Sequence, residues 1–265
     1  HKGNFFLCLN IDTRREIKMY IKTNGIVLRE IEYKDSDKLL TVLTQELGKR
    51  TFRARGVKSS RSRLKSACQL LAYSEFTVLE THDRYVITEA VTQEMFPELR
   101  QDIELLSLAS YFVQLTDAVA QEGDEATELL SLLLNALYAL AKLKRPQTLV
   151  KAVFELRLAC ISGFLPDLRG CAVCGREDSD RFNITQGVLQ CSNCQSAGLE
   201  GIRMPVSAGT LAAMRFIAAG DPKRLFSFRL SEQSLRELND ITESYLSMRL
   251  ERGFYTLDLY KSLFL

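Results

Sequence analysis

The sequence predicts an α+β protein with more than one domain: an N-terminal five-stranded OB-fold barrel, then an all-α helical domain with an embedded four-cysteine zinc module. Three observations lead to this fold class. Apolar residues alternate with a period of two over residues 19–95, which is typical of strands. A helical period of 3.6 follows over most of residues 96–265. Two Cys-x2-Cys pairs interrupt the helical pattern within residues 167–203.

The first domain contains the predicted strands. They cover residues 20–29, 38–44, 49–57, 70–79 and 85–91. Gly48 lies in the turn before the third strand, where it can take the positive φ that other residues avoid. So many strands in so short a segment fit a small closed barrel, and the OB-fold is the common five-stranded barrel that binds single strands. An SH3-like barrel is the alternative.

Pro97 marks the change to helices, because its ring cannot continue a central strand and suits the first turn of a helix. The predicted helices cover residues 98–121, 125–144, 146–161, 207–219 and 232–252. Asp124, Ser207 and Ser231 are suitable N-caps. The tail, residues 254–265, is too apolar to lie free in water, so we expect it to pack on the helical domain or to dock a partner.

The overall composition is that of a folded, non-membrane protein. The 265 residues are 46% hydrophobic and 26% charged, with a net charge of +2. No apolar run approaches the ~20 residues of a membrane span. Seven cysteines without a secretory signal favour a reducing cytoplasm and metal binding over disulfides. Because the first methionine is Met19, we treat residues 1–18 as an N-terminal extension, not necessarily native, and exclude it from the fold.

Positive charge is concentrated in residues 48–65. This segment holds Lys49, Arg50, Arg53, Arg55, Lys58, Arg61, Arg63 and Lys65, and no acidic residue occurs between Glu46 and Glu75. On the predicted third strand Arg53 and Arg55 share a face with Lys49, while Phe52 points to the other face. Three serines separate the later cations, which is typical of a flexible loop.

A row of cations beside a cationic loop suits the phosphate backbone of a nucleic acid. We therefore interpret all eight basic residues as candidate DNA-binding residues. The alternative is a solvated, charged edge strand that protects the barrel against aggregation.

The cysteine pairs are the most specific motif. Cys171 and Cys174 are separated by 16 residues from Cys191 and Cys194. Each pair can turn two thiolates towards one point, and residues 183–189 between the pairs can form a hairpin. Four sulfurs fill the tetrahedral shell of Zn²⁺ and leave no position for an activated water, so we expect one structural zinc per chain. Two redox-active pairs and an iron–sulfur site are the alternatives.

No catalytic motif is present. The sequence lacks a phosphate-binding P-loop, a dinucleotide-binding glycine motif, a nucleophile elbow and a metalloprotease helix, and no serine or cysteine has a plausible base. We therefore expect a binding protein and not an enzyme. Several aromatic residues of the barrel could stack on bases, although the core is the first expectation for each of them: Tyr33, Phe52, Tyr73, Phe76 and Tyr85.

The order of the parts resembles a known family. The matching segments in the barrel are Gly25–Arg29, Asp35–Asp37, Leu39–Thr44, Gly48–Lys49, Ala54–Gly56 and Ser62–Leu64. Phe154–Leu158 and Gly163–Pro166 follow in the helical region, directly before the cysteine module. Taken together, and over about residues 19–250, the chain resembles the zinc-containing branch of the bacterial RecO family of DNA repair proteins.

The resemblance implies a recombination mediator. Such proteins bind single- and double-stranded DNA, anneal complementary strands, contact the acidic C-terminal tail of the single-stranded-DNA-binding protein, and with RecR help to load RecA. It also implies a bacterial, cytoplasmic and nucleoid-associated protein without membrane contact. A zinc-containing RNA-binding or transcription-associated OB-fold protein is the alternative.

The binding site for the acidic tail is expected in the helical region. Such a tail needs an apolar groove bordered by cations, and Lys151 and Arg157 flank Phe154 and Leu158 on one predicted helix. The alternative places Phe154 in the core and leaves the helix with an ordinary solvated face.

Overall fold

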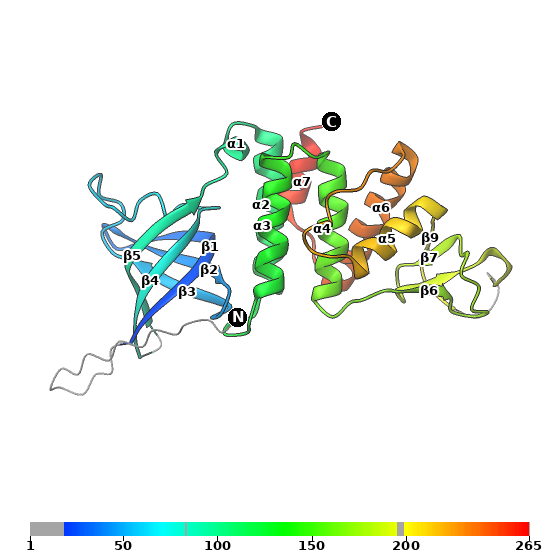
Figure 1. Cartoon of the computed structure of the whole chain (residues 1–265), viewed down its shortest axis with the longest axis horizontal. Coiled ribbons are helices and arrows are strands. Elements are labelled where there is room, and N and C mark those ends of the chain that lie inside the picture. Colours follow the sequence, from blue (N-terminus) through cyan, green and yellow to red (C-terminus); the bar gives the residue numbers. More distant parts are fainter. Residues whose placement is uncertain (1–18, 83, 195–198, 265) are drawn as a thin grey trace. The chain divides into compact units, whose positions relative to one another are not determined.

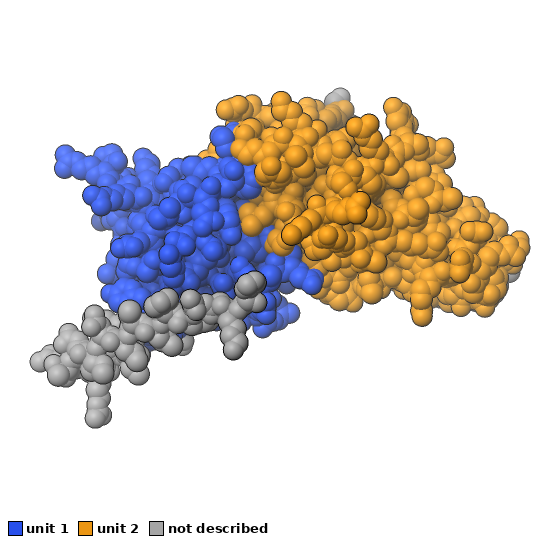
Figure 2. Space-filling view, in the orientation of Figure 1, with its two compact units in different colours: residues 1–97, 116–130 blue, residues 98–115, 131–265 orange. Residues whose placement is uncertain are grey.

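The computed structural model describes residues 19–82, 84–194 and 199–264. It divides into two compact units (Figure 2), one of residues 1–97 with 116–130 and one of residues 98–115 with 131–265. Each unit is described by itself.

The first unit contains a closed barrel (Figure 1). Its strands are β1 (Met19–Tyr33), β2 (Asp37–Thr44), β3 (Lys49–Ala54), β4 (Tyr73–Thr81) and β5 (Arg84–Glu94). The strand order around the barrel is β1-β2-β3-β5-β4, and all neighbours are antiparallel except β3 and β5, which pair in parallel. This order confirms the predicted OB-like fold over the SH3-like alternative.

The barrel is filled by the inward side of the alternating strands. On β3, Phe52 and Ala54 are fully buried while Thr51 and Arg53 face outward, as the period of two predicts. The Phe52 ring packs edge-on against Phe76, with 5.8 Å between the ring centroids. Two predicted base-stacking candidates, Phe52 and Phe76, therefore belong to the core.

Several strand ends differ from prediction by up to four residues, and two of these differences shape the outer surface. β1 runs past Arg29 to Tyr33, because after a bulge between Val27 and Arg29 it continues to pair with β2 as far as Asp37. β3 ends at Ala54, since Gly56 turns the chain with a φ of +62° and donates its N–H to Asp37. These changes bring the β1–β2 turn next to the end of β3.

The start of β3 is covered by a loop of the same unit. Gly48 and Lys49 form bridges with Glu122, and the Lys49 N–H donates to the Gln121 carbonyl. Gly48 lies so close to the Asp124 carbonyl oxygen that a Cβ at this position would be 2.0 Å from it. This contact explains why residues 116–130 group with the barrel.

The second unit is mainly helical. Its helices are α1 (Pro97–Arg100), α2 (Ile103–Val119), α3 (Thr127–Ala141), α4 (Gln147–Ile161), α5 (Ala208–Ala219), α6 (Glu232–Leu250) and α7 (Tyr255–Ser262), of which α1 begins, α2 ends and α3 begins in the first unit. The single helix predicted over residues 98–121 is divided, because Asp102 accepts the N–H groups of Glu104 and Leu105 and caps α2. The apolar tail forms α7. None of the described helices is both long and apolar enough to cross a membrane.

Helix α4 lies in the core of this unit, where it packs against α5 and α6. Phe154 stacks on Phe112 of α2 with 4.2 Å between the ring centroids. Between α4 and α5 the chain forms a small sheet of β6 (Asp167–Cys171), β7 (Arg181–Asn183), β8 (Val188–Gln190) and β9 (Arg203–Pro205) in the order β6-β8-β7-β9. Its β7–β8 hairpin turns at Gly187, within the predicted hairpin.

Candidate functional site

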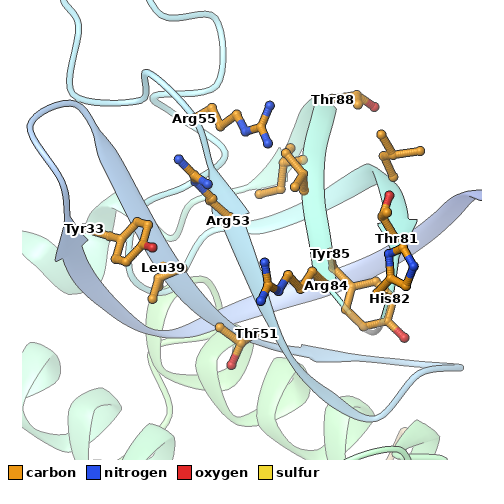
Figure 3. Close-up of a pocket in the computed structure, with 13 residues that line it drawn as sticks. Tyr33, Leu39, Thr51, Arg53, Arg55, Thr81, His82, Arg84, Tyr85 and Thr88 are labelled. Atoms are coloured by element: carbon orange, nitrogen blue, oxygen red, sulfur yellow. The ribbon is translucent and has the colours of Figure 1, made fainter. Parts of the chain in front are cut away.

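An open groove of about 810 Å³ lies on the outside of the barrel (Figure 3). The end of β1 and β2 form one side, β3 forms the floor, and the β4–β5 hairpin forms the other side. Its lining includes Tyr33, Arg53, Arg55, His82, Arg84 and Thr88. The groove therefore joins two predicted DNA-binding residues to aromatic and basic side chains from other strands.

Arg53 is held by a carboxylate. Its Nε and Nη2 atoms lie 2.8 and 2.6 Å from Oδ2 of Asp37, and Oδ1 of Asp37 accepts the Gly56 N–H at 2.9 Å. The Gly56 N–H and the Arg53 guanidinium hold the pKa of Asp37 below its usual range. The alternation pattern did not predict this pairing, which follows from the extended β1–β2 ladder.

Arg53 also contacts an aromatic ring. Its Cζ lies 5.2 Å from the centroid of Tyr33, and Lys34 Nζ lies 5.5 Å from the same ring. Tyr33 is 37% exposed, whereas Tyr85 on the opposite side of the groove is 9% exposed and belongs to the core. Of the predicted stacking candidates, Tyr33 is thus the one presented on the groove surface.

Three further predicted cations have partners in the structure. Lys49 Nζ lies 3.2 Å from Asp117 Oδ1 and donates to the Asp117 carbonyl at 2.7 Å. Lys58 pairs with Glu32 at 3.1 Å. Arg50 is half-buried, with its Cζ 5.6 Å from the centroid of the Tyr85 ring. The Lys49 and Arg50 contacts hold β3 to neighbouring parts of the first unit, and the Lys58 pair ties the segment after β3 to β1.

Four predicted cations remain exposed: Arg55, Arg61, Arg63 and Lys65. None of their side chains makes an ion pair or hydrogen bond with a described residue. The segment that carries three of them was predicted as a flexible loop and consists of consecutive hydrogen-bonded turns, such as Ser62 N–H to the Ser59 carbonyl. These cations keep their full charge for a ligand.

Sequence reasoning missed two contributors to the groove. Arg84 and His82 belong to the β4–β5 hairpin and were not among the candidate residues. The sequence signal was present: an outward Arg at the start of a strand that neighbours β3 adds a cation to the same face. The sequence did not reveal that β3 pairs in parallel with β5, and this pairing places the β4–β5 hairpin beside Arg53.

The predicted metal ligands come together. The Sγ atoms of Cys171, Cys174, Cys191 and Cys194 all lie within 4.8 Å of one another. The Cys174 and Cys191 sulfurs are 3.7 Å apart. Around a tetrahedral zinc with Zn–S distances of ~2.3 Å, neighbouring sulfurs are separated by about 3.8 Å. The cluster therefore has the dimensions of a tetrathiolate site.

The backbone supports a thiolate at Cys171. Burial alone would raise the pKa of Cys171, but hydrogen bonds from backbone N–H groups, including that of Cys191 at 3.4 Å, outweigh it and lower the pKa to about 6. Glycine is required at position 170, where the backbone passes close to Gly175: a Cβ at Gly170 would lie 2.7 Å from the Gly175 carbonyl oxygen. The backbone therefore favours a sulfur anion at Cys171, whereas hydrogen bonds with the neighbouring thiols raise the pKa of Cys194 to about 12 in the absence of a metal.

Two arginines attach the module to the helices of its own unit. Arg215 of α5 donates to the carbonyls of Leu168, Arg169 and Glu177, and Arg249 of α6 donates to those of Ile184 and Thr185. Another cation of the module, Arg169, is paired with Asp167 at 2.7 Å.

The residues predicted to bind a partner do not form a groove. Phe154 and Leu158 are fully buried and Lys151 is 2% exposed, while Arg157 donates to the carbonyls of Ile217 and Ala218. Lys151 instead belongs to a buried network, in which its Nζ lies 2.9 Å from Glu155 and 2.8 Å from Glu243. The predicted apolar groove on α4 is absent because most residues of this helix are buried. The alternative interpretation, in which Phe154 belongs to the core, describes α4.

Comparison with known proteins covers almost all of the described chain. The family model "Recombination protein O N terminal" matches residues 19–96, and "Recombination protein O C terminal" matches residues 100–258. The DNA repair protein RecO of Acetivibrio thermocellus is 33% identical over 246 residues, which cover 92% of this chain and 97% of the relative. RecO of Caldicellulosiruptor saccharolyticus is 31% identical over 244 residues, or 91% of this chain and 98% of the relative.

Proposed function

The chain belongs to the RecO family of DNA repair and recombination proteins, and from this premise we propose that it is a recombination mediator that acts by binding. It binds single- and double-stranded DNA, anneals complementary strands, and helps to load RecA on DNA coated with single-stranded-DNA-binding protein. Residues 19–95 act as the DNA-binding domain, and residues 96–265 act as a helical domain that carries the zinc module. The protein makes and breaks no covalent bond in this role.

The observation that carries the proposal is the set of four exposed cations without described partners, Arg55, Arg61, Arg63 and Lys65. An ion pair already formed inside the protein contributes little to binding a polyanion, whereas an unpaired cation releases counterions from DNA when it contacts a phosphate. Phosphates of two strands neutralised on one surface repel each other less, which favours annealing. Because phosphate contacts read no bases, the surface is nearly independent of sequence.

The four-cysteine cluster holds one structural Zn²⁺. The sulfur spacing, the N–H groups directed at Cys171 and the absence of a nitrogen or oxygen ligand in the described cluster fit zinc. When bound, the ion joins the two Cys-x2-Cys turns of a sheet that is too small to have an extensive core. Arg215 and Arg249 then hold the completed module on α5 and α6.

RecR, the acidic C-terminal tail of the single-stranded-DNA-binding protein and, indirectly, RecA are the proposed protein partners. The protein works in the cytoplasm, associated with the nucleoid. We no longer assign the acidic tail to α4, because Lys151, Phe154 and Leu158 are not accessible.

The decisive test is annealing of complementary oligonucleotides coated with their binding protein. The triple variant Arg55→Ala, Arg61→Ala, Arg63→Ala should lose annealing and show a salt slope of log Kd smaller by about 2, since each phosphate contact on a single strand contributes about 0.7. A matched triple variant, Lys223→Ala, Arg224→Ala, Arg229→Ala, removes the same charge from exposed residues of the second unit and should anneal normally.

Equal activity of the two triple variants would reject the barrel surface as the site. Tighter binding to RNA than to DNA of the same sequence would favour the RNA-binding alternative instead.

A further inference from the structure

We propose that Tyr33, positioned by Arg53 and Asp37, is a stacking platform for an unpaired nucleobase, so that the barrel groove distinguishes single strands from duplex. The proposal deepens the proposed function and rests on it. The exposed loop cations bind any phosphate backbone. The groove, in contrast, binds one unstacked base of a single strand through this platform.

The first argument is the exposure of Tyr33. Large aromatic residues of the barrel, such as Phe52 and Phe76, are fully buried, but Tyr33 at the end of β1 is 37% exposed and lines the groove. Figure 3 shows its ring beside Arg53 on one side of the groove. An exposed ring at the edge of a cationic groove is the arrangement by which proteins bind single strands through base stacking.

The second argument is that the platform is held in place before any ligand binds. Arg53 Cζ lies 5.2 Å from the Tyr33 ring centroid, and the guanidinium cannot turn away, because Asp37 accepts two of its hydrogen bonds at 2.6 and 2.8 Å. Asp37 is itself fixed by the Gly56 N–H. A ring and a guanidinium fixed in advance lose little rotational freedom when a base is added.

The third argument is the charge around the ring. Asp37 neutralises much of the Arg53 charge, so Arg53 serves this site as a planar surface and not as a phosphate ligand. Arg55, which directly follows the end of β3 and lines the same groove, is exposed and makes no ion pair with a described residue. A strand that places a base on Tyr33 therefore has a cation beside it for the neighbouring phosphate.

The platform excludes duplex for a simple reason. In a duplex both faces of each base are covered by neighbouring bases, and a base must leave the stack before it can reach an outside ring. Removing Tyr33 should then weaken single-strand binding and leave phosphate-only binding unchanged.

The test compares three probes of equal length with the full chain: fluorescein-labelled oligothymidylate, the same backbone with abasic sites, and a duplex. Tyr33→Ala should weaken oligothymidylate binding about tenfold, and Tyr33→Phe should bind as wild type. Neither variant should change binding of the abasic strand or the duplex. Tyr20→Ala is the matched control, since Tyr20 is 42% exposed on the same strand but does not line the groove.

A spectroscopic readout separates stacking from a structural effect. The chain contains no tryptophan, so Tyr33→Trp introduces a single reporter. Its emission should be quenched by oligothymidylate and not by the abasic strand. Unquenched emission, or a Tyr33→Ala variant that binds all probes as wild type or loses all equally, would overturn the platform. Failure of the proposed function would look different, because the wild-type chain would then bind none of the three probes.

Discussion

Arg53 donates two hydrogen bonds to a single carboxylate oxygen of Asp37, at 2.8 and 2.6 Å. The two residues come from different strands of the barrel, β3 and β2, and Asp37 also accepts the Gly56 N–H that follows β3. The pair closes the corner where the β1–β2 turn meets the end of β3. This ion pair distinguishes Arg53 from Arg55, although the two arginines look alike in the sequence. Arg53 has a partner within the protein, and Arg55 has none among the described residues.

Arg53→Ala and Arg55→Ala should therefore affect different properties of the protein. Arg53→Ala should lower the melting temperature of the barrel and leave the salt slope of DNA binding unchanged, because the Arg53 charge is already paired with Asp37. Arg55→Ala should leave the melting temperature unchanged and reduce the salt slope by about 0.7. Thermal unfolding and a salt titration of binding to a single strand measure the two effects.

The pH dependence of the Arg53→Ala defect follows from the lowered pKa of Asp37. A carboxylate whose folded pKa is depressed contributes stability that is fully present above its unfolded pKa, about 3.9, and is lost as the pH falls through the folded value. The difference in melting temperature between wild type and Arg53→Ala should be constant near neutral pH and shrink in strong acid. A constant difference down to that range would show that Asp37 is not the partner that matters.

Much of this architecture could be predicted because local pattern and tertiary structure agree. The period of two on β3 predicts the burial of Phe52, and the spacing of Cys171 to Cys194 predicts the cluster, since both signals lie within short segments. The partners of the cations could not be predicted in the same way. The pairing of Arg53 with Asp37 depends on the register of separate strands, and a residue's own strand pattern does not encode it. Burial of Lys151 likewise depends on helices distant in the sequence.

Gly48 should be essential for the contact between β3 and the loop that follows α2. Gly48 and Gly56 have nearly the same φ, +63° and +62°, so an alanine is strained at either position. At Gly56 a Cβ meets nothing within 4 Å, whereas at Gly48 it would lie 2.0 Å from the Asp124 carbonyl oxygen. Gly56→Ala should cost about 1–2 kcal/mol of unfolding free energy, and Gly48→Ala more than about 3 kcal/mol.

Urea denaturation measures both costs under the same conditions. Gly56→Ala is the matched control, because it carries the backbone strain without the collision. If both variants lost the same unfolding free energy, the loop that follows α2 would have moved to accommodate the new Cβ. The close approach of Asp124 to Gly48 would then not constrain the barrel.

Removing one thiolate should remove the zinc. Cys191→Ser replaces a buried ligand of the cluster and should lower the metal content from about one zinc per chain to nearly none. Residues 167–194 should then become sensitive to proteases, because the metal supplies much of the folding free energy of such a small sheet. Cys160→Ala, which lies outside the cluster, should keep both its zinc and its protease resistance. Elemental analysis that finds no zinc in the freshly purified wild-type chain would refute the assignment.

Lys151 should be required to keep Glu155 charged in the core. The Glu155 carboxylate is fully buried, accepts the hydroxyls of Tyr111 and Thr242, and lies 2.9 Å from Lys151 Nζ. Lys151→Met leaves this carboxylate without its cation and should cost about 3–5 kcal/mol of unfolding free energy. Adding Glu155→Gln should restore most of the loss, because glutamine carries no charge. Its carbonyl can accept the Tyr111 hydroxyl while its amide NH2 donates to the Thr242 hydroxyl, which can itself donate to the Asn239 carbonyl.

Burial raises the pKa of Glu155, and Lys151 opposes this effect. In Lys151→Met the opposition is gone, so the folded state binds a proton that the unfolded state releases above its pKa of about 4.3. Stability gained from a raised pKa is present at low pH and is lost as the pH rises through the folded value. The single variant should therefore approach wild-type stability as the pH is lowered from neutral towards the unfolded pKa of about 4.3, while the double variant should keep a constant offset. Parallel pH profiles for the two variants would show that Glu155 is not the residue that Lys151 neutralises.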